Sequence, residues 1–447
     1  MNSLTCVLLC GLLWPTFSSH GEDWPQWLGP DRDGIWKEGG ILTTFPKNGP
    51  EILWRVPIGA GYAGPAVADG RVFVTDRLLA PDAQGSENPF KRGEIPGTER
   101  ILCFAESDGE LLWEKEYPAN YTVSYAAGPR AVPTVDGDLV YTLGAEGNLF
   151  CFHVETGEER WSKSFRDTLG IPAPVWGFAA PPLVYRNLLI CLAGGDGSVA
   201  IAYNKETGQE VWRSLSWKEP GYCPPTLLHH GGRDQIIIWH PGSVNSLDPL
   251  TGEVFWSVPW ELRAGLSIPT PKQDGDLLFL TAFYNGSTML RLNADQSSPQ
   301  ILWQTKQVSE KRTTHLNSIM PTPVLTDGLI FGTCSYGEFR CLDQLTGERL
   351  WESMQPSTGE GRKLRWFNNH MTPYLNHTHY FLFSETGDLI IAKLSREGYQ
   401  EIDRAHLIEP NGKDMRQRPI VWSHPAYANA SAFLRNDSEL IRVNLKE

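Results

Sequence analysis

A short phrase that ends in tryptophan recurs along this chain at nearly regular intervals. Each copy reads as a turn followed by a short strand, as in ETGEERW and LTGERLW. The intervals between successive tryptophans are 48, 51, 44, 47 and 48 residues. A period in the forties without the 3.6-residue periodicity of helices predicts the blades of a β-propeller. The tryptophans of these six copies are Trp113, Trp161, Trp212, Trp256, Trp303 and Trp351.

The clearest copy, residues 132–161, indicates what one blade contains. Its apolar residues alternate in four runs, VPTV, DLVYTL, NLFCFHV and EERW. Between these runs lie Asp-Gly, Glu-Gly and Thr-Gly pairs, which suit the positive-φ positions of tight hairpin turns. We therefore expect four antiparallel strands in each repeat.

The two ends of the chain are expected to share the last blade. A seventh copy has Ile402 in place of the tryptophan, and an eighth copy stops after three strands. The segment NGPEILWRV, which contains Trp54, has the closing-strand pattern but no strands of its own before it. Pairing of residues 51–56 with residues 439–445 would close the ring and leave no unpaired edge. The sequence thus predicts an all-β, eight-bladed propeller of four-stranded antiparallel blades, forming one domain over residues 48–447.

Two segments precede the predicted propeller. Residues 1–20 contain an apolar run that is too short to span a bilayer and is followed by small and polar residues, so we interpret them as a cleaved signal peptide. The protein is then expected to be periplasmic or secreted. Residues 22–47 form an arm without the repeat period. We expect its Trp24, Trp27 and Trp36 to pack the arm against the ring, the alternative being a role in binding a partner.

Composition narrows the function classes. The net charge of −13 and the sequence pI near 5.4 argue against general binding of nucleic acids or anionic membranes. Three of the cysteines, Cys103, Cys151 and Cys341, occupy one repeat position. Equivalent positions in neighbouring blades lie too far apart for a disulfide, so we expect unpaired, buried cysteines.

The repeat pattern sorts the loops onto two faces of the ring. The turns between strands one and two and between strands three and four share one face. The connectors between blades share the other, which we call the connector face, with the remaining hairpin turn. The long segment Arg77–Thr98 falls on the connector face, either as a functional lid or as a tolerated insertion. Lys and Arg outnumber Asp and Glu by seven over the eight connectors, which favours an anionic ligand there.

Each connector ends in proline where the innermost strand begins, so the residues just before that proline are expected to line the mouth of the central channel. His315, His370 and His424 precede the innermost strands of three consecutive blades. Three imidazoles could hold a metal, but their unequal distances from the following proline favour no metal. The ligand-binding residues that we predict on the connector face are Arg130, Trp176, His315, Asn317, Asn369, His370, Arg418 and His424.

The repeat, with P-T-x-x-D-G-x-x-Y in its first half and T-G-x-x-x-W at its end, resembles the PQQ-type repeat of quinoprotein alcohol dehydrogenases and of the outer-membrane assembly protein BamB. The resemblance covers about residues 52–445. The opening WPQWLGPDRDG is similar to exported BamB-like proteins of environmental bacteria. The resemblance implies that the repeat tryptophans dock between blades as structural residues; these are Trp54, Trp113, Trp161, Trp212, Trp256, Trp303 and Trp351.

The dehydrogenases with this repeat use a Cys-Cys disulfide, a calcium ion and an aspartate base together with PQQ. This sequence has no adjacent cysteine pair, and Asp167, Glu219, Glu261 and Glu310 are scattered over four connectors. We therefore predict no catalytic residue, no metal and no cofactor. We expect a monomeric, non-catalytic scaffold that binds an envelope or extracellular protein, a polysaccharide or a small anionic ligand. The alternatives are a PQQ- and calcium-dependent alcohol dehydrogenase, and a hydrolase or lyase built on the histidines.

Overall fold

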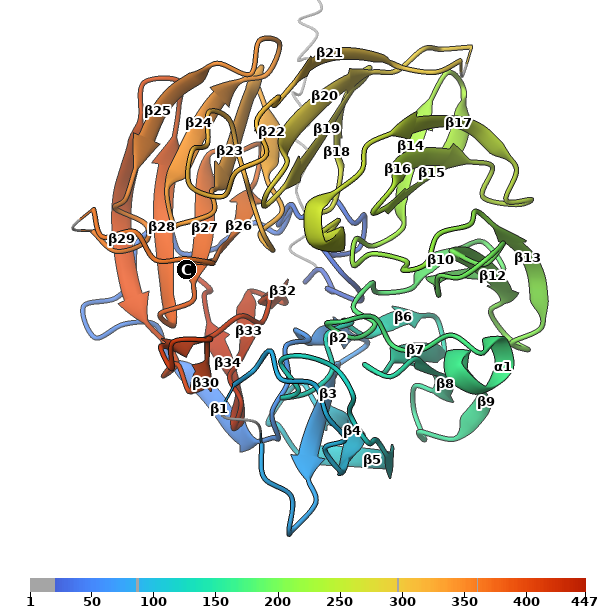
Figure 1. The fold of residues 1–447 in the computed structure, drawn as a ribbon. Coiled ribbons are helices and arrows are strands. Elements are labelled where there is room, and N and C mark those ends of the chain that lie inside the picture. The colour runs from blue at the N-terminus through green and yellow to red at the C-terminus, as the bar shows by residue number, and fades with distance from the viewer. Residues whose placement is uncertain (1–20, 86–87, 296, 360) are drawn as a thin grey trace, which may run out of the picture.

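The computed structural model of this protein describes residues 21–85, 88–295, 297–359 and 361–447. Its strands form eight four-stranded antiparallel sheets arranged in a ring (Figure 1). The all-β, eight-bladed propeller predicted from the sequence is confirmed. The predicted signal peptide, residues 1–20, lies outside the described residues. Among the described residues, no helix is long and apolar enough to cross a membrane.

The first seven blades are each built from four consecutive strands. Blades one to four comprise β2 (Ala66–Ala68), β3 (Arg71–Leu79), β4 (Gly97–Ala105) and β5 (Leu111–Pro118); β6 (Thr134–Asp136), β7 (Leu139–Leu143), β8 (Asn148–His153) and β9 (Glu159–Ser164); β10 (Leu183–Tyr185), β11 (Leu188–Leu192), β12 (Ala200–Asn204) and β13 (Glu210–Ser214); and β14 (Thr226–His230), β15 (Arg233–His240), β16 (Ser243–Leu247) and β17 (Val254–Pro259).

Blades five to seven continue the pattern, and the connectors add four short elements. The three blades comprise β18 (Lys272–Asp274), β19 (Leu277–Ala282), β20 (Gly286–Arg291) and β21 (Gln300–Gln304); β22 (Val324–Thr326), β23 (Leu329–Thr333), β24 (Phe339–Asp343) and β25 (Arg349–Ser353); and β26 (Asn369–Tyr374), β27 (His379–Ser384), β28 (Asp388–Leu394) and β29 (Tyr399–His406). The short elements are α1 (Phe165–Leu169), the 3-10 turn η1 (Arg263–Gly265), β30 (Gly412–Lys413) and β31 (Pro419–Ile420).

The eighth blade combines the two ends of the chain. Its strands β32 (Ala426–Ala428), β33 (Ser431–Arg435) and β34 (Glu439–Asn444) are followed by β1 (Ile52–Pro57) at the outer edge. β1 runs antiparallel to β34, with Arg55 opposite Ile441. The outer strand of the last blade therefore comes from the N-terminal part of the chain.

Among the described residues, a tryptophan on the outer strand joins one blade to the next by a hydrogen bond at six of the eight interfaces. Trp161 of β9 donates its Nε1–H to the carbonyl of Lys205 in the following blade at 2.9 Å. Its ring lies over Gly208, which has a φ of +68°, and a Cβ added to Gly208 would lie 2.7 Å from that ring. Both the turn and the close contact thus require glycine. The same joint links Trp54 to Glu106, Trp113 to Val154, Trp212 to Pro249, Trp303 to Gln344 and Trp351 to Ser395.

The long loop of blade one is shorter than the segment Arg77–Thr98 expected from the sequence. Strands β3 and β4 extend to the pair Leu79–Gly97, which leaves residues 80–96 as the loop. The six cysteines among the described residues are unpaired and buried, as predicted.

The arm, residues 22–47, crosses the face of the ring opposite the connectors, behind the centre in Figure 1. Trp24 bridges to Val67 of blade one. Arg32 donates to the carbonyls of Pro182 and Pro225, which precede blades three and four, at 3.1 and 3.4 Å. Trp36 is fully buried and stacks on Tyr427 of blade eight. It also forms a backbone bridge to Tyr374 of blade seven. These contacts fix the arm across the channel.

Removal of one joint tests its contribution to stability. We expect Trp161→Ala to lower the free energy of unfolding by about 3–5 kcal/mol, because it removes a buried indole and leaves a cavity between two blades. Val211→Ala, at a 51% exposed position of β13, is the matched control and should change it by less than about 0.5 kcal/mol. Urea denaturation followed by circular dichroism measures both. Equal effects of the two substitutions would contradict the role of the joint.

Candidate ligand-binding site

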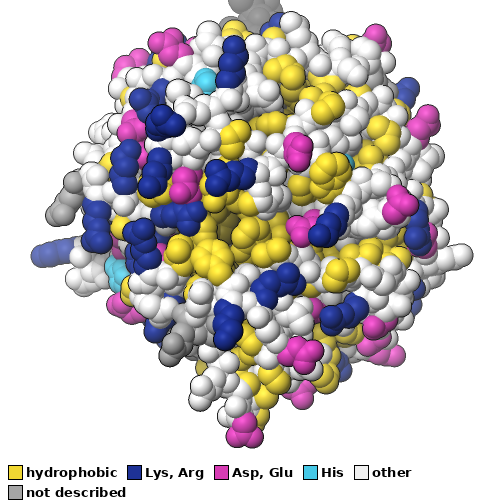
Figure 2. Space-filling view, in the orientation of Figure 1, with side chains coloured by type: hydrophobic (Ala, Val, Ile, Leu, Met, Phe, Trp, Pro, Cys, Tyr) yellow, Lys and Arg dark blue, Asp and Glu magenta, His cyan; other side chains and the backbone are white. Residues whose placement is uncertain are grey.

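The connectors surround a cavity at the centre of the connector face. Its volume is about 180 Å³, and Figure 2 shows it as a hollow lined by apolar side chains. Connector residues supply almost all of its wall, since each connector turns inward just before the proline that begins the innermost strand. We call this cavity the aromatic cup, because seven of its lining residues are Trp27, Tyr62, Tyr125, Trp176, Tyr222, Trp366 and Trp422.

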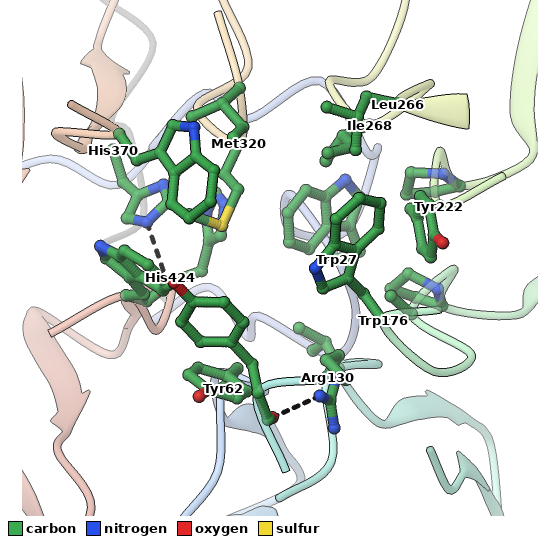
Figure 3. Close-up of a pocket in the computed structure, with 18 residues that line it drawn as sticks. Trp27, Tyr62, Arg130, Trp176, Tyr222, Leu266, Ile268, Met320, His370 and His424 are labelled. Atoms are coloured by element: carbon green, nitrogen blue, oxygen red, sulfur yellow. Dashed lines mark hydrogen bonds between the residues drawn. The ribbon is translucent and has the colours of Figure 1, made fainter. Parts of the chain in front are cut away.

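The floor of the aromatic cup comes from the arm. Trp27 enters the channel from the face opposite the connectors and lies among the lining residues in Figure 3. Its Nε1–H donates to Thr270 Oγ1 at 2.9 Å, and its ring meets His424 edge-on with the centroids 4.2 Å apart. With its indole N–H satisfied and its ring fixed, Trp27 forms a rigid base.

Two histidines stand in contact at one side of the aromatic cup. The ring centroids of His370 and His424 are 3.6 Å apart. His370 Nε2 lies 3.3 Å from the carbonyl oxygen of Trp422. Burial lowers the pKa of His370 to about 4. Burial also holds the pKa of His424 well below its ordinary value, and the neighbouring His370 ring lowers it further. Both rings are therefore neutral at neutral pH.

The only charged side chain in the lining that the structure describes is Arg130. Its guanidinium donates to the carbonyls of Gly128, Ser124 and Tyr125 at 2.5–2.8 Å. Much of its hydrogen bonding therefore stabilises the connector to which it belongs. Its guanidinium also lies 5.3 Å from the Tyr62 ring centroid. The wall thus keeps one positive charge within an otherwise apolar lining.

Four of the eight predicted ligand-binding residues lie in the aromatic cup: Arg130, Trp176, His370 and His424. The other four do not. Asn369 begins β26 directly before His370, and successive residues of a strand point to opposite faces, so only one of the two can face the cup. Asn317 is buried and donates to the carbonyl of Phe283 at 3.0 Å.

His315 and Arg418 have structural partners elsewhere. The His315 ring stacks on the repeat tryptophan Trp303, with centroids 5.2 Å apart, and its Nδ1 lies 2.9 Å from Thr305 Oγ1. The three histidines therefore do not converge, and within the described parts of the chain no three or more His, Cys, Asp or Glu residues are placed to hold a metal. Arg418 forms ion pairs with Glu385 and Asp414 beside the cup.

Sequence reasoning missed most of the aromatic wall. Tyr62, Tyr125, Tyr222, Trp366 and Trp422 all lie in the connector segments, close before the innermost strands, yet none was selected. The recurrence of a Tyr or Trp in successive connectors is the signal that could have identified them.

The residues of the aromatic cup do not fit the calcium–quinone centre of the quinoprotein dehydrogenases. Calcium requires several oxygen ligands, and none of the described lining residues is a carboxylate or a carboxamide. The six described cysteines are separate, so none can form an adjacent disulfide. The connector carboxylate Glu310 is paired with Arg365 at 2.7 Å. We therefore derive no redox step from this site.

The long loop of blade one reaches this site. Phe90 packs against Tyr125 and Trp366, with ring centroids 5.4 and 5.6 Å apart, and the Tyr125 amide donates to the carbonyl of Pro89 at 2.6 Å. The loop thus contributes to the rim of the aromatic cup.

Fold, repeat and site together define a PQQ-repeat β-propeller with an aromatic central cavity. The family model described as "Outer membrane protein assembly factor BamB" matches residues 97–353, more than half of the chain, and the chain belongs to this family.

Curated relatives and solved structures agree with this assignment. The chain is 26% identical over 288 residues to the outer membrane protein assembly factor BamB of Burkholderia pseudomallei. This alignment covers 58% of this chain and 68% of the relative. It is 21% identical to the Yersinia pestis BamB, over 49% of this chain and 55% of the relative.

Among solved structures, BamB from Moraxella catarrhalis aligns with a TM-score of 0.55 at 15% identity, covering 88% of this chain and 98% of that one. A quinohemoprotein alcohol dehydrogenase from Pseudomonas putida aligns with a TM-score of 0.58 at 12% identity, covering 95% and 80%. At these identities the structural matches show the shared fold alone.

The buried histidines predict a specific acid sensitivity. The pKa of His370 is near 4 in the folded protein and about 6.5 when unfolded. The unfolded chain therefore binds a proton that the folded protein does not, and stability falls as pH drops from about 6.5 toward 4. The free energy of unfolding should fall between pH 7 and pH 4.5, and we expect this fall to be about 2 kcal/mol smaller in His370→Gln than in the unmodified protein. Urea denaturation at both pH values measures this. Equal losses would contradict neutral burial of His370.

The lining also predicts how the protein responds to a quinone. Because the described lining offers no carboxylate or carboxamide ligand for calcium, we expect PQQ with calcium to leave the melting temperature unchanged. A thermal-shift assay with PQQ, calcium, both and neither measures this, since tight binding to the folded state must raise the melting temperature. A rise of several degrees that requires both additives would show that the site does hold the quinone with calcium.

Proposed function

We propose that this protein is an exported, non-catalytic binding module that holds a partner at the aromatic cup on its connector face. The observation that carries this proposal is the cavity itself: it is closed below by Trp27, open on the connector face, and lined by aromatic rings rather than by paired acids and bases. Aromatic side chains in a preformed concave site supply large apolar contact area at little entropic cost.

Family membership supports a partner in the cell envelope. The related proteins are named outer membrane protein assembly factors, and we extend this to an envelope or extracellular partner of the present chain. Export, by the predicted signal peptide of residues 1–20, would place the protein in the periplasm or outside the cell. The proposal further takes the propeller to be monomeric and to bind neither nucleic acid nor a membrane.

Site-specific photo-crosslinking tests this proposal. We would replace Met415, 39% exposed beside the aromatic cup, with p-benzoyl-phenylalanine and irradiate the protein with an envelope fraction. Leu250 is the matched control, since it is 42% exposed but lies in a turn on the opposite face. We expect a discrete crosslinked product from the Met415 position and none from the Leu250 position.

Equal crosslinking at both positions, or none at either, would contradict a binding site on the connector face. The two positions have similar exposure, so differences in general reactivity cannot produce the expected result.

A further inference from the structure

A second cavity adjoins the aromatic cup. Its volume is about 230 Å³, and it lies between the connector of residues 352–372 and that of residues 403–424. Trp366 lines both cavities, so the two are neighbours on either side of one residue. We call the second cavity the arginine groove, because four of its lining residues are Arg362, Arg365, Arg416 and Arg418.

Part of the charge of the arginine groove is not neutralised. Arg365 is paired with Glu310, and Arg418 with Glu385 and Asp414. Arg362 and Arg416, however, are exposed and form no ion pair within the described residues, and the same holds for Lys311 and Arg312 of the preceding connector. Figure 2 shows Lys and Arg side chains gathered beside the central hollow.

One nearby cation also affects the titration of Arg418. Burial, followed by the nearby charge of Arg362, lowers the pKa of Arg418 to about 10. Like charges held this close favour an anionic occupant, because the occupant relieves their repulsion.

Several buried polar atoms around the aromatic cup also lack partners. Trp366 Nε1, His370 Nδ1 and His424 Nε2 form no hydrogen bond within the described structure. All three residues line the cup. Buried polar groups in folded proteins are nearly always paired, so these atoms indicate a ligand that supplies polar contacts at this side of the cavity.

From these observations we propose that the occupant is an acidic peptide segment of a partner protein that carries one large aromatic side chain. The aromatic ring enters the cup above Trp27, and the flanking carboxylates contact Arg362, Arg416 and the cations of residues 311–312. The inference rests on the proposed function and specifies its partner. An aromatic anchor in a desolvated pocket with charged groups at the rim is the arrangement that concentrates binding energy in protein interfaces.

The cavities fit a peptide better than a sugar or a small anion. A sugar ring carries several hydroxyl groups that each need a partner when buried, whereas most of the described side chains that line the cup are aromatic or aliphatic and offer polar partners at few positions. The unpaired cations come from three successive connectors. An extended segment of several residues, which advances about 3.3 Å per residue, can contact cations on more than one connector, whereas a small anion offers a single point of contact.

Synthetic peptides test this inference directly. The probe is the peptide Asp-Glu-Trp-Glu-Asp, with Ala in place of Trp and with Lys in place of the acids as matched peptides. Isothermal titration calorimetry at low and physiological salt would measure binding to the mature protein. We expect the acidic Trp peptide to bind at least tenfold more tightly than either matched peptide and to weaken as salt rises.

Protein variants locate the contact. Arg416→Glu and Arg362→Glu replace exposed side chains, so the fold should persist, and each should weaken binding of the acidic Trp peptide at least tenfold. Arg160→Glu is the matched control, because Arg160 is exposed on β9 and also lacks an ion pair within the described residues; it should leave binding unchanged. Trp176→Ala, checked for folding by circular dichroism, should weaken the Trp peptide but not the Ala peptide.

Equal binding of the Trp and Ala peptides, or no effect of the charge reversals, would overturn the inference. So would tight binding of an acidic oligosaccharide, such as tetragalacturonate, without binding of the peptide. If the peptide fails while crosslinking at the Met415 position succeeds, the class of partner is wrong and the connector-face site stands. If both fail, the proposed function fails as well.

Discussion

The joint between the outer-strand tryptophan of one blade and the turn of the next is the interaction on which the rest of this structure depends. A four-stranded blade has two apolar faces and is stable only when its neighbours cover them. The indole on the outer strand spans that interface, and its N–H reaches a carbonyl of the next blade, as Trp161 reaches Lys205. Because Gly208 brings the turn against the ring, the tryptophan of one repeat and the Thr-Gly of the next form one contact. Trp54 repeats this joint between blade eight and blade one, so the ends of the chain are fastened in the same way.

A ring of eight blades leaves a central channel, and different segments of the chain cover its two ends. On one side the arm crosses the ring and Trp27 enters the channel, where its ring is fixed by Thr270 and His424. On the other side the connectors turn inward and supply aromatic rings. The channel thus becomes a cup that is open in one direction. Its cations lie at the rim and in the adjoining groove, because the buried wall tolerates few charges. The rest of the protein is acidic, so the electrostatic potential at this rim differs in sign from that of most of the surface.

The sequence predicted the fold well because the blade is a local unit. Alternating apolar residues, turn dipeptides and the repeated tryptophan all specify the same four strands within about fifty residues. The site was predicted less well because it is assembled from connectors far apart in the chain. His370 and Asn369 are adjacent in sequence, but strand alternation sends only His370 to the cup. His315 was grouped with the other histidines, yet it stacks on Trp303 between blades. Nothing in the sequence of the arm indicated that Trp27, rather than Trp24 or Trp36, enters the channel.

If the aromatic cup is a preformed site for an aromatic group whose acidic flank lies toward the arginine groove, a small aromatic acid should bind there. A crystal structure of the mature protein soaked with indole-3-acetate tests this. We expect density for the indole ring above Trp27 and beside Trp176, with the carboxylate directed past Trp366 toward Arg416 or Arg362. An empty or water-filled cup in crystals whose connector face is free of lattice contacts would show that the cup is not such a site, as would indole bound only at other surfaces.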